Sequence, residues 1–165
     1  MEKSVNGVLL TTEFTMEDVE TSIRRQREIF GGEFGFLDSS HPYAEKAIRE
    51  FVKTWQAEKD FMLVAKAGDR FVGTITFMGE ENGVGRLRFL IVEPDMRGKG
   101  LGKAIVTTAL EWAKDMGYSH IYLSTHSILN TARRMYSKLG FVKTGEESAE
   151  EVCPGAMEEV WEIDV

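Results

Sequence analysis

The stretch that decides the fold is LIVEPDMRGKGLG, residues 90–102. Its first residues are typical of a buried strand, Pro94 breaks that strand, and a glycine-rich turn then opens a helix at about Leu101. Glycines let backbone N–H groups converge without side chains in the way, and a helix N-terminus adds a positive potential. The turn is therefore suited to phosphate, and Arg97, Lys99 and Lys103 add cationic groups to it.

Two common phosphate-binding patterns do not fit this turn. No Gly-Lys-Ser/Thr ending follows four spacer residues, as a P-loop requires. The glycines fall at 98, 100 and 102, which is not the Gly-x-Gly-x-x-Gly spacing of dinucleotide-binding folds. A plain helix-opening turn with a solvated basic face is the alternative interpretation.

A second group of residues lies further along the chain, between Asn130 and Phe141. Asn130 has the chemistry of a helix N-cap, but its amide is also suited to an amide-bearing ligand. Tyr136 lies among apolar neighbours, so it is either a core residue or a site residue. Gly140 is expected to stop a helix just before a strand begins at Phe141.

Helices and strands alternate around these motifs without a linker, which predicts a single domain over residues 1–165. Thr15 is expected to cap a first helix, Gly31-Gly32 to end it, and Pro42 to stand in the first turn of a second. The pattern predicts an α/β fold of order βααβββαβαββ, a mixed sheet with helices on its faces. We expect strands at 5–12, 61–65, 71–78, 87–92, 120–125, 141–147 and 157–165, and later helices at 101–116 and 130–139.

These motifs resemble the GNAT acetyltransferase superfamily. The turn at residues 97–102 matches its Gln/Arg-x-x-Gly-x-Gly/Ala motif. Asn130, Ala132, Tyr136 and Gly140-Phe141 match its Asn-x-Ala…Tyr-x-x-x-Gly-Phe motif. The resemblance is strong from Phe61 to Phe141 and weaker over nearly the whole chain. Within the superfamily, residues 87–94 and 131–136 are similar to the acetyltransferase half of bacterial MarR–GNAT fusions, without their DNA-binding half.

The resemblance implies a largely antiparallel seven-stranded sheet in which strands 87–92 and 120–125 run parallel and splay apart. It implies acetyl-CoA as co-substrate, held along the splayed strands and on the glycine turn. Asn130 would bond the pantetheine arm, Arg133 would reach the CoA phosphates, and Tyr136 would lie near the sulfur. The implied cofactor residues are Ile91, Val92, Arg97, Gly98, Lys99, Gly100, Leu101, Gly102, Lys103, Asn130, Arg133 and Tyr136.

The resemblance also implies a reaction, which is direct attack of a neutral amine on the thioester. A backbone N–H near Val92 would stabilise the oxyanion, and Tyr136 would protonate the departing thiolate. The general base stays open, because this chain carries Arg86 and Arg88 where many family members have a Glu.

The nearest acids to that strand are Glu80 and Glu81, which are otherwise two solvated carboxylates of a turn. His126 or solvent are further candidates for the base. Cys153 lies in an acidic loop that opposes a thiolate, so we do not expect it to act as a nucleophile.

The acceptor site is expected at the loop of residues 31–36, the turn before strand 87–92 and the loop between the last two expected strands. Glu33 would bind an ammonium, and Phe34 and Phe36 would form apolar walls, although both rings equally suit the core. The sequence leaves the acceptor unnamed: small polyamine, antibiotic, amino acid or protein N-terminus. A non-catalytic acyl-CoA sensor and a transferase of another acyl group are the competing functions.

The net charge is −7, from 20 basic and 27 acidic residues. This sign argues against nucleic acid as a partner and mildly favours a cationic amine, although it also serves solubility alone. A single cysteine excludes an intrachain disulfide and a cysteine-based zinc site, and we expect no metal. The absence of a long apolar run or signal pattern predicts a cytoplasmic protein without a membrane partner. Family analogy adds a possible homodimer.

Overall fold

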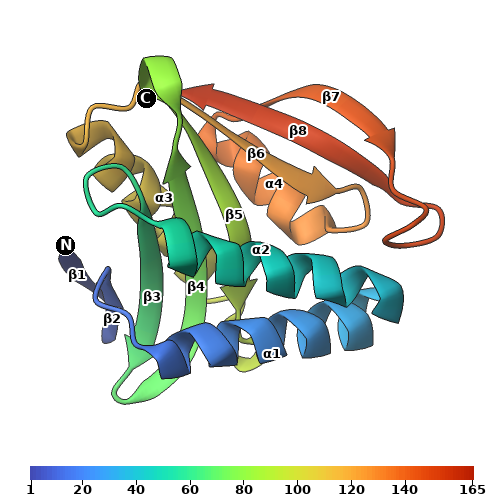
Figure 1. Ribbon diagram of the computed structural model, residues 1–165, viewed down its shortest axis with the longest axis horizontal. Helices are drawn as coiled ribbons and strands as arrows, with labels where there is room; N and C mark the ends of the chain where they lie inside the picture. Colours follow the sequence, from blue (N-terminus) through green and yellow to red (C-terminus); the bar gives the residue numbers. More distant parts are fainter.

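The computed structural model describes residues 1–165 and contains a single mixed sheet of eight strands. The strand order is β1-β2-β3-β4-β5-β6-β8-β7, and every neighbouring pair is antiparallel except β5 and β6 (Figure 1). The strands are β1 (Glu2–Val5), β2 (Val8–Thr11), β3 (Phe61–Ala67), β4 (Arg70–Gly79), β5 (Val84–Val92), β6 (His120–His126), β7 (Val142–Ser148) and β8 (Met157–Asp164). The helices are α1 (Met16–Phe34), α2 (His41–Thr54), α3 (Leu101–Asp115) and α4 (Asn130–Leu139), with short 3₁₀ turns η1 (Asp38–Ser40), η2 (Glu81–Gly83) and η3 (Pro94–Met96).

The α/β class, the mixed sheet and the order of helices are as predicted, but the first strand is divided into two. Asn6 and Gly7 both have positive φ, 50° and 80°, and fold residues 2–11 into a hairpin. Positive φ at both central residues is the backbone of a type I′ turn, for which Asn-Gly is the preferred pair. The sheet therefore has eight strands instead of seven.

Helix α1 begins as predicted and ends later than predicted. Thr15 and Asp18 form a capping box, in which each side chain accepts from the other's backbone N–H. Gly31 does not end the helix. A Cβ at that position would lie 2.8 Å from Nε2 of His41, so this glycine admits the close approach of α2. The helix ends instead at Gly35, which adopts a left-handed φ of 72°.

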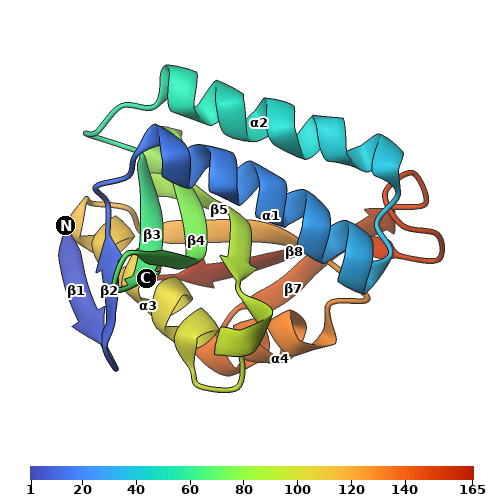
Figure 2. The same cartoon turned by 90° about the horizontal axis from the view of Figure 1, so that it is seen from below.

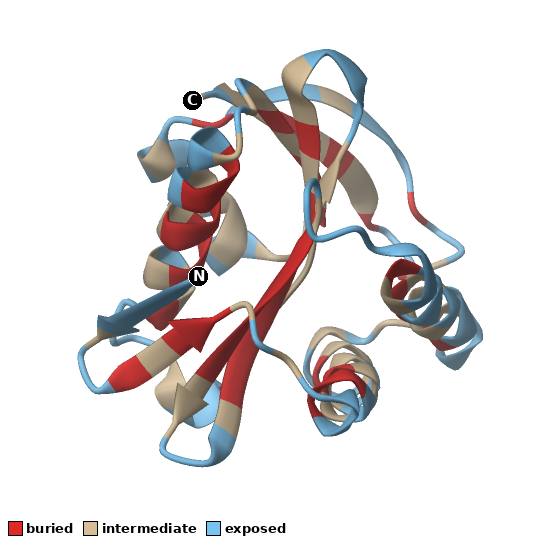
Figure 3. Ribbon diagram, turned by 60° about the vertical axis from the view of Figure 1, so that its left-hand side comes forward, coloured by how far each residue is buried: buried red, intermediate tan, exposed pale blue.

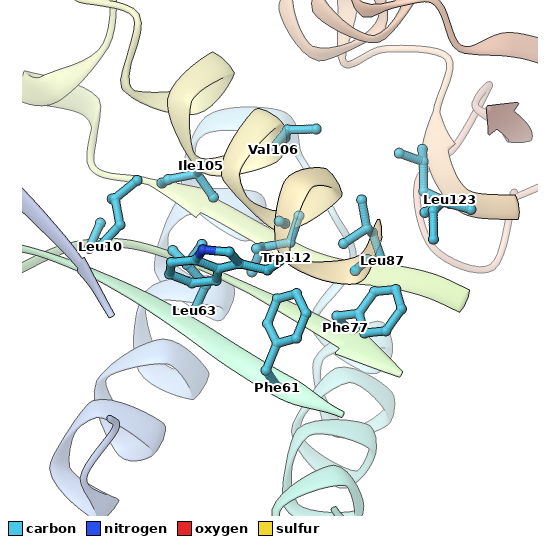
Figure 4. Packing of buried hydrophobic residues seen from close by; sticks show 14 of the residues in the cluster. Leu10, Phe61, Leu63, Phe77, Leu87, Ile105, Val106, Trp112 and Leu123 are labelled. Atoms are coloured by element: carbon cyan, nitrogen blue, oxygen red, sulfur yellow. The ribbon is translucent and has the colours of Figure 1, made fainter. Parts of the chain in front are cut away.

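The two faces of the sheet are covered by different helices, as Figure 2 shows. Helix α3 packs on one face, where Leu87, Ile105, Trp112 and Leu123 belong to a core of 20 buried residues (Figure 4). Helices α1 and α2 cover the other face with a smaller cluster. Figure 3 shows the buried residues concentrated on the central strands between these two layers. No helix combines the length and the apolar character needed to cross a membrane.

Candidate active site

Strands β5 and β6 pair only over their first halves. Their parallel register runs from Val84↔His120 to Leu87↔Leu123 and then stops. Beyond that point β5 continues against β4 up to Val92, and β6 continues against β8 up to His126. Figure 1 shows the two strands diverging towards their C-terminal ends. Residues 88–92 therefore have no partner strand on the β6 side, and we call the last paired position, Leu87/Leu123, the vertex.

A bulge in β5 marks the start of this divergence. The register with β4 shifts between Thr74 and Thr76, and Phe89 in the shifted segment has a φ of 57°. A left-handed φ is unusual for an aromatic residue. Because a bulge bends its strand and increases the local twist, this one turns β5 away from β6. The predicted cofactor residues Ile91 and Val92 lie in the segment that is left without a β6 partner.

The glycine turn that follows β5 leaves a helix N-terminus open. Gly98 and Gly100 have left-handed φ values of 76° and 80°, and a Cβ on either would meet nothing within 4 Å. Gly100 is the N-cap of α3, and no side chain caps this end. The first N–H groups of a helix have no partner within the helix. Lys99 and Lys103 are exposed beside them, so the end carries unpaired donors and positive charge.

Gly102 brings three of the predicted parts together. A Cβ on this residue would lie 3.5 Å from Cγ2 of Val92 and 3.6 Å from Sδ of Met135. The glycine turn, the end of β5 and helix α4 therefore meet at one place. Met135 is next to Tyr136 in the chain, so the turn and the predicted general acid belong to neighbouring elements.

Tyr136 is the one buried residue of α4, with 5% of its surface exposed. Its ring packs edge-on against Phe141, with 5.6 Å between the ring centroids. Burial raises the pKa of the Tyr136 phenol well above its usual range, so this hydroxyl stays protonated at neutral pH. A neutral phenol is able to donate a proton or a hydrogen bond.

The side chains of Asn130 and Arg133 have partners within the protein. The N-cap of α4 is Leu129 and no side chain caps the helix, so the capping interpretation of Asn130 is wrong. Arg133 forms a two-pronged ion pair with the buried Glu159, Nε to Oε1 at 2.8 Å and Nη2 to Oε2 at 3.1 Å. It also donates to Oδ1 of Asn130 at 3.1 Å. Arg133 would have to leave Glu159 to reach a CoA phosphate.

Two of the predicted acceptor-binding residues lie against the glycine turn. Arg97 forms an ion pair with Glu33 at the end of α1. Its guanidinium also lies 5.8 Å from the ring centroid of Phe34. The Glu33 carboxylate is therefore already matched to a cation, and these residues tie α1 to the turn. Phe36 does not lie against the glycine turn. Its ring packs edge-on against that of His126, with 4.8 Å between the ring centroids.

His126 lies at the end of β6 with its Nδ1 buried and without a hydrogen-bond partner. Burial lowers the pKa of His126, so the imidazole is neutral at pH 7. Phe36 connects it to the small buried cluster of the β7–β8 loop, which contains Cys153. Sγ of Cys153 is buried and lies 3.6 Å from the carbonyl oxygen of Phe34.

The two candidate bases of the β4–β5 turn differ in their surroundings. Oε1 of Glu80 accepts a hydrogen bond of 2.5 Å from the Tyr122 hydroxyl, whereas Glu81 is an exposed residue of η2 without a side-chain partner. Tyr122 is paired with Arg86 in the β5–β6 register, one position before the vertex. Burial and the hydrogen bond to Glu80 raise the pKa of Tyr122. Only Glu80 therefore contacts a residue of β6 beside the vertex.

Tyr122 and Glu159 are residues of this region that the sequence motifs do not predict. Glu159 carried a signal, because it stands in the same alternating phase as the buried Trp161. A carboxylate in the buried phase of a strand needs a cation, which Arg133 supplies. Tyr122 carried no such signal, since its contact with Glu80 depends on the register of β5 with β6.

Comparisons with known proteins agree with this geometry. Residues 23–141 match the model of the Acetyltransferase (GNAT) family. Human N-acetyltransferase 8B is 38% identical over 88 residues, which cover 50% of this chain and 39% of that protein. The "Uncharacterized N-acetyltransferase YjgM" of Escherichia coli is 28% identical over 131 residues, 77% of this chain and 78% of that protein. The chain thus spans about two fifths of the length of the human relative.

Solved structures share the fold at low sequence identity. An acetyltransferase from Streptococcus agalactiae superposes with a TM-score of 0.80 at 16% identity, over 98% of this chain and 100% of that one. A putative streptothricin acetyltransferase from Bacillus anthracis, crystallised in complex with acetyl coenzyme A, has a TM-score of 0.60 at 20% identity, over 70% of this chain and 68% of that one.

Proposed function

Because the chain belongs to the GNAT acetyltransferase family, we propose that it transfers the acetyl group of acetyl-CoA to a primary amine of a small molecule or peptide. The observation that carries this proposal is the combination of a splayed strand pair with an uncapped, glycine-opened helix at its end. The unpaired β5 segment suits an extended amide-bearing arm, and the turn beyond it suits a diphosphate. Both features lie at the same end of β5.

The proposed roles follow the positions of the residues. The backbone of Ile91 and Val92 would pair with the pantetheine arm, and Asn130 would bond it from the start of α4. The N–H groups of residues 98–103 would hold the pyrophosphate, with Lys99 and Lys103 beside it. We leave Arg133 out of this set because Glu159 already holds it.

Acetyl-CoA supplies a thioester carbonyl that a neutral amine attacks directly. A backbone N–H of the splayed β5 segment, near Val92, would stabilise the charge that develops on the carbonyl oxygen. Tyr136 is held protonated and would donate to the departing sulfur. Glu80 would take the proton from the amine, directly or through water, from its position beside Tyr122. Phe36 and His126 would border the acceptor further along β6.

Isothermal titration with acetyl-CoA, followed by an assay of CoA release with a panel of amines, tests this function. Gly100→Val should weaken acetyl-CoA binding at least about 10-fold, because a left-handed β-branched residue is strained and would crowd the phosphate. Gly117→Val is the matched control, since Gly117 has a φ of 98° and open space at the other end of α3. It should lose stability without losing affinity.

The results separate the competing functions. Tight binding of acetyl-CoA without turnover of any amine would indicate a sensor, and faster transfer from a longer acyl-CoA would indicate another donor. No binding heat at all would contradict the proposal. The similarity to MarR–GNAT fusions, the cytoplasmic location and the homodimer stay predictions.

A further inference from the structure

Two arginines stand side by side on β5 without an acidic partner. Arg86 and Arg88 are both half-buried, and neither forms an ion pair. Their guanidinium groups lie over aromatic rings instead, Arg86 at 5.6 Å from the Tyr122 centroid and Arg88 at 4.6 Å from that of Phe89. In the sequence, both residues stand out only as a departure from the family pattern.

This arrangement of two arginines costs free energy. Nε of Arg86 is buried and has no hydrogen-bond partner. Burial lowers the pKa of Arg88, and the neighbouring charge of Arg86 lowers it further, while Tyr43 of α2 acts in the opposite direction. Half-buried like charges repel each other and lose solvation. A chain with 27 acidic residues has many carboxylates with which to neutralise them, yet neither guanidinium forms an ion pair with one.

Other partly buried arginines of this protein are neutralised. All three show the usual solution, in which the guanidinium lies on a carboxylate at about hydrogen-bonding distance. These pairs are Arg25–Glu93, Arg97–Glu33 and Arg133–Glu159. The pair on β5 is therefore an exception within the same molecule.

The position of the two arginines connects them to the acceptor side of the proposed reaction. They flank Leu87, the vertex residue of β5, and successive strand side chains point to opposite faces. Leu87 belongs to the core beneath α3. Arg86 is paired with Met78, which packs towards α1 and α2. The arginines thus face the α1/α2 side, opposite to the helix that carries the glycine turn.

The phosphates of acetyl-CoA do not account for these charges. Arg88 precedes Val92 by four residues, about 13 Å at the usual rise of a strand. The glycine turn lies beyond Val92 and on the α3 side. An anion at Arg88 would lie beside the vertex, where the proposed reaction brings the amine.

Resting on the proposed function, we propose that the acceptor is an amine that carries a carboxylate a few bonds from its nitrogen, as an amino acid does, and that Arg86 and Arg88 bind this carboxylate. The planar fork of a guanidinium matches the two oxygens of a carboxylate. The aromatic rings beneath the guanidinium groups hold them in place when the site is empty. Glu80, held by Tyr122 next to Arg86, lies on the side from which the ammonium would be deprotonated.

The charge beside the vertex is opposite in sign to the net charge of the protein, and only the net charge favours a cationic acceptor. The charge of −7 is a property of the whole surface and acts at long range, where salt screens it. Recognition at the vertex depends on the groups within a few ångströms. There the local charge is positive.

The test uses the full chain and a panel of amino acids, each with its carboxamide, its decarboxylated amine and its aminophosphonate. The acid should be acetylated with a kcat/KM about 10- to 100-fold above that of its amide and amine, as expected for a charge-assisted contact. Arg88→Met should remove most of this difference by raising KM for the acid, and Arg88→Lys should restore part of it. Arg27→Met is the matched control, because Arg27 is an exposed arginine of α1 without an ion pair.

The affinity of every variant for acetyl-CoA is measured by calorimetric titration. This measurement separates a failure of the carboxylate proposal from a failure of the proposed acetyltransferase function. Binding should be unchanged in Arg88→Met, and thermal unfolding should show equal or higher stability because a repulsion is removed. Three outcomes would overturn the proposal that the arginines bind a carboxylate. The unaltered chain could acetylate acid, amide and amine at equal rates, or it could prefer the phosphonate. Arg88→Met could also lose the same activity on all substrates. If no amine is turned over, the proposed function fails. Calorimetric titration of the same acids into the CoA-saturated chain then decides the inference, and absence of binding overturns it.

Discussion

The two faces of the sheet present different kinds of chemical groups. The face under α3 and α4 offers backbone groups, glycines and one buried phenol, and its parts follow each other within residues 91–136. The face under α1 and α2 offers charged and aromatic side chains from β5, β6 and the β4–β5 turn, namely Glu80, Arg86, Arg88 and Tyr122. Under the proposed function, the first face would bind one large, constant co-substrate, and the second face would bind a variable acceptor.

This difference explains why the sequence motifs of this protein indicate its family but not its acceptor. Backbone recognition needs a particular backbone path, and only a few residue types allow it, so it leaves a motif. Recognition by side chains depends on which residues the sheet register places together. Such residues have no fixed spacing along the sequence. Three changes test this contrast.

Tyr136→Phe should have the largest effect. It should lower kcat by about 10²–10⁴ because the proton donor to the departing sulfur is lost. The affinity for acetyl-CoA should change less than about threefold, since the ring still packs on Phe141. Steady-state kinetics and titration calorimetry measure the two quantities. Tyr118→Phe is the control, because that hydroxyl bonds only to the Lys59 carbonyl. Full activity of Tyr136→Phe would remove this residue from the mechanism.

Arg133→Met should lower the free energy of unfolding by about 3 kcal/mol, because it leaves the buried Glu159 short of its main cation. Lys143 lies 3.2 Å from the same carboxylate and limits the loss. Acetyl-CoA affinity should stay the same if Arg133 only supports the fold. Denaturant unfolding and calorimetry give both values. Arg134→Met, an exposed change one residue on, should alter neither. Weaker CoA binding at unchanged stability would return Arg133 to the cofactor site.

Glu80→Gln should have the smallest of these effects, a fall in kcat of about 10- to 100-fold, because solvent replaces part of a general base. Glutamine keeps an acceptor for the Tyr122 hydroxyl but loses the basic carboxylate. Glu81→Gln, the adjacent exposed residue, should retain activity. The rates are measured with saturating acetyl-CoA. Equal rates in both variants would assign proton removal to His126 or to solvent.

Local signals predicted much of the fold. Helix α4 has the predicted bounds, and α3 starts at the predicted Leu101. The Asn82-Gly83 pair turns the chain between β4 and β5 with φ values of 60° and 74°, in keeping with the preference of this dipeptide for hairpin turns. The errors arose where a local signal had a tertiary purpose: Gly31 looked like a helix end but makes room for His41. Glu33 looked like a free anion but is paired with Arg97, 64 residues away in the chain.

The sequence by itself determined the glycine turn, the helix that follows it and the phase of each strand, because these depend on φ/ψ preferences and on contacts between near neighbours. Only the tertiary structure decided where β5 and β6 part, which arginines find a carboxylate and which stay unpaired. Those outcomes depend on strand register and on helix packing across the sheet. They are set by contacts between distant residues, for which the chain carries no local signal.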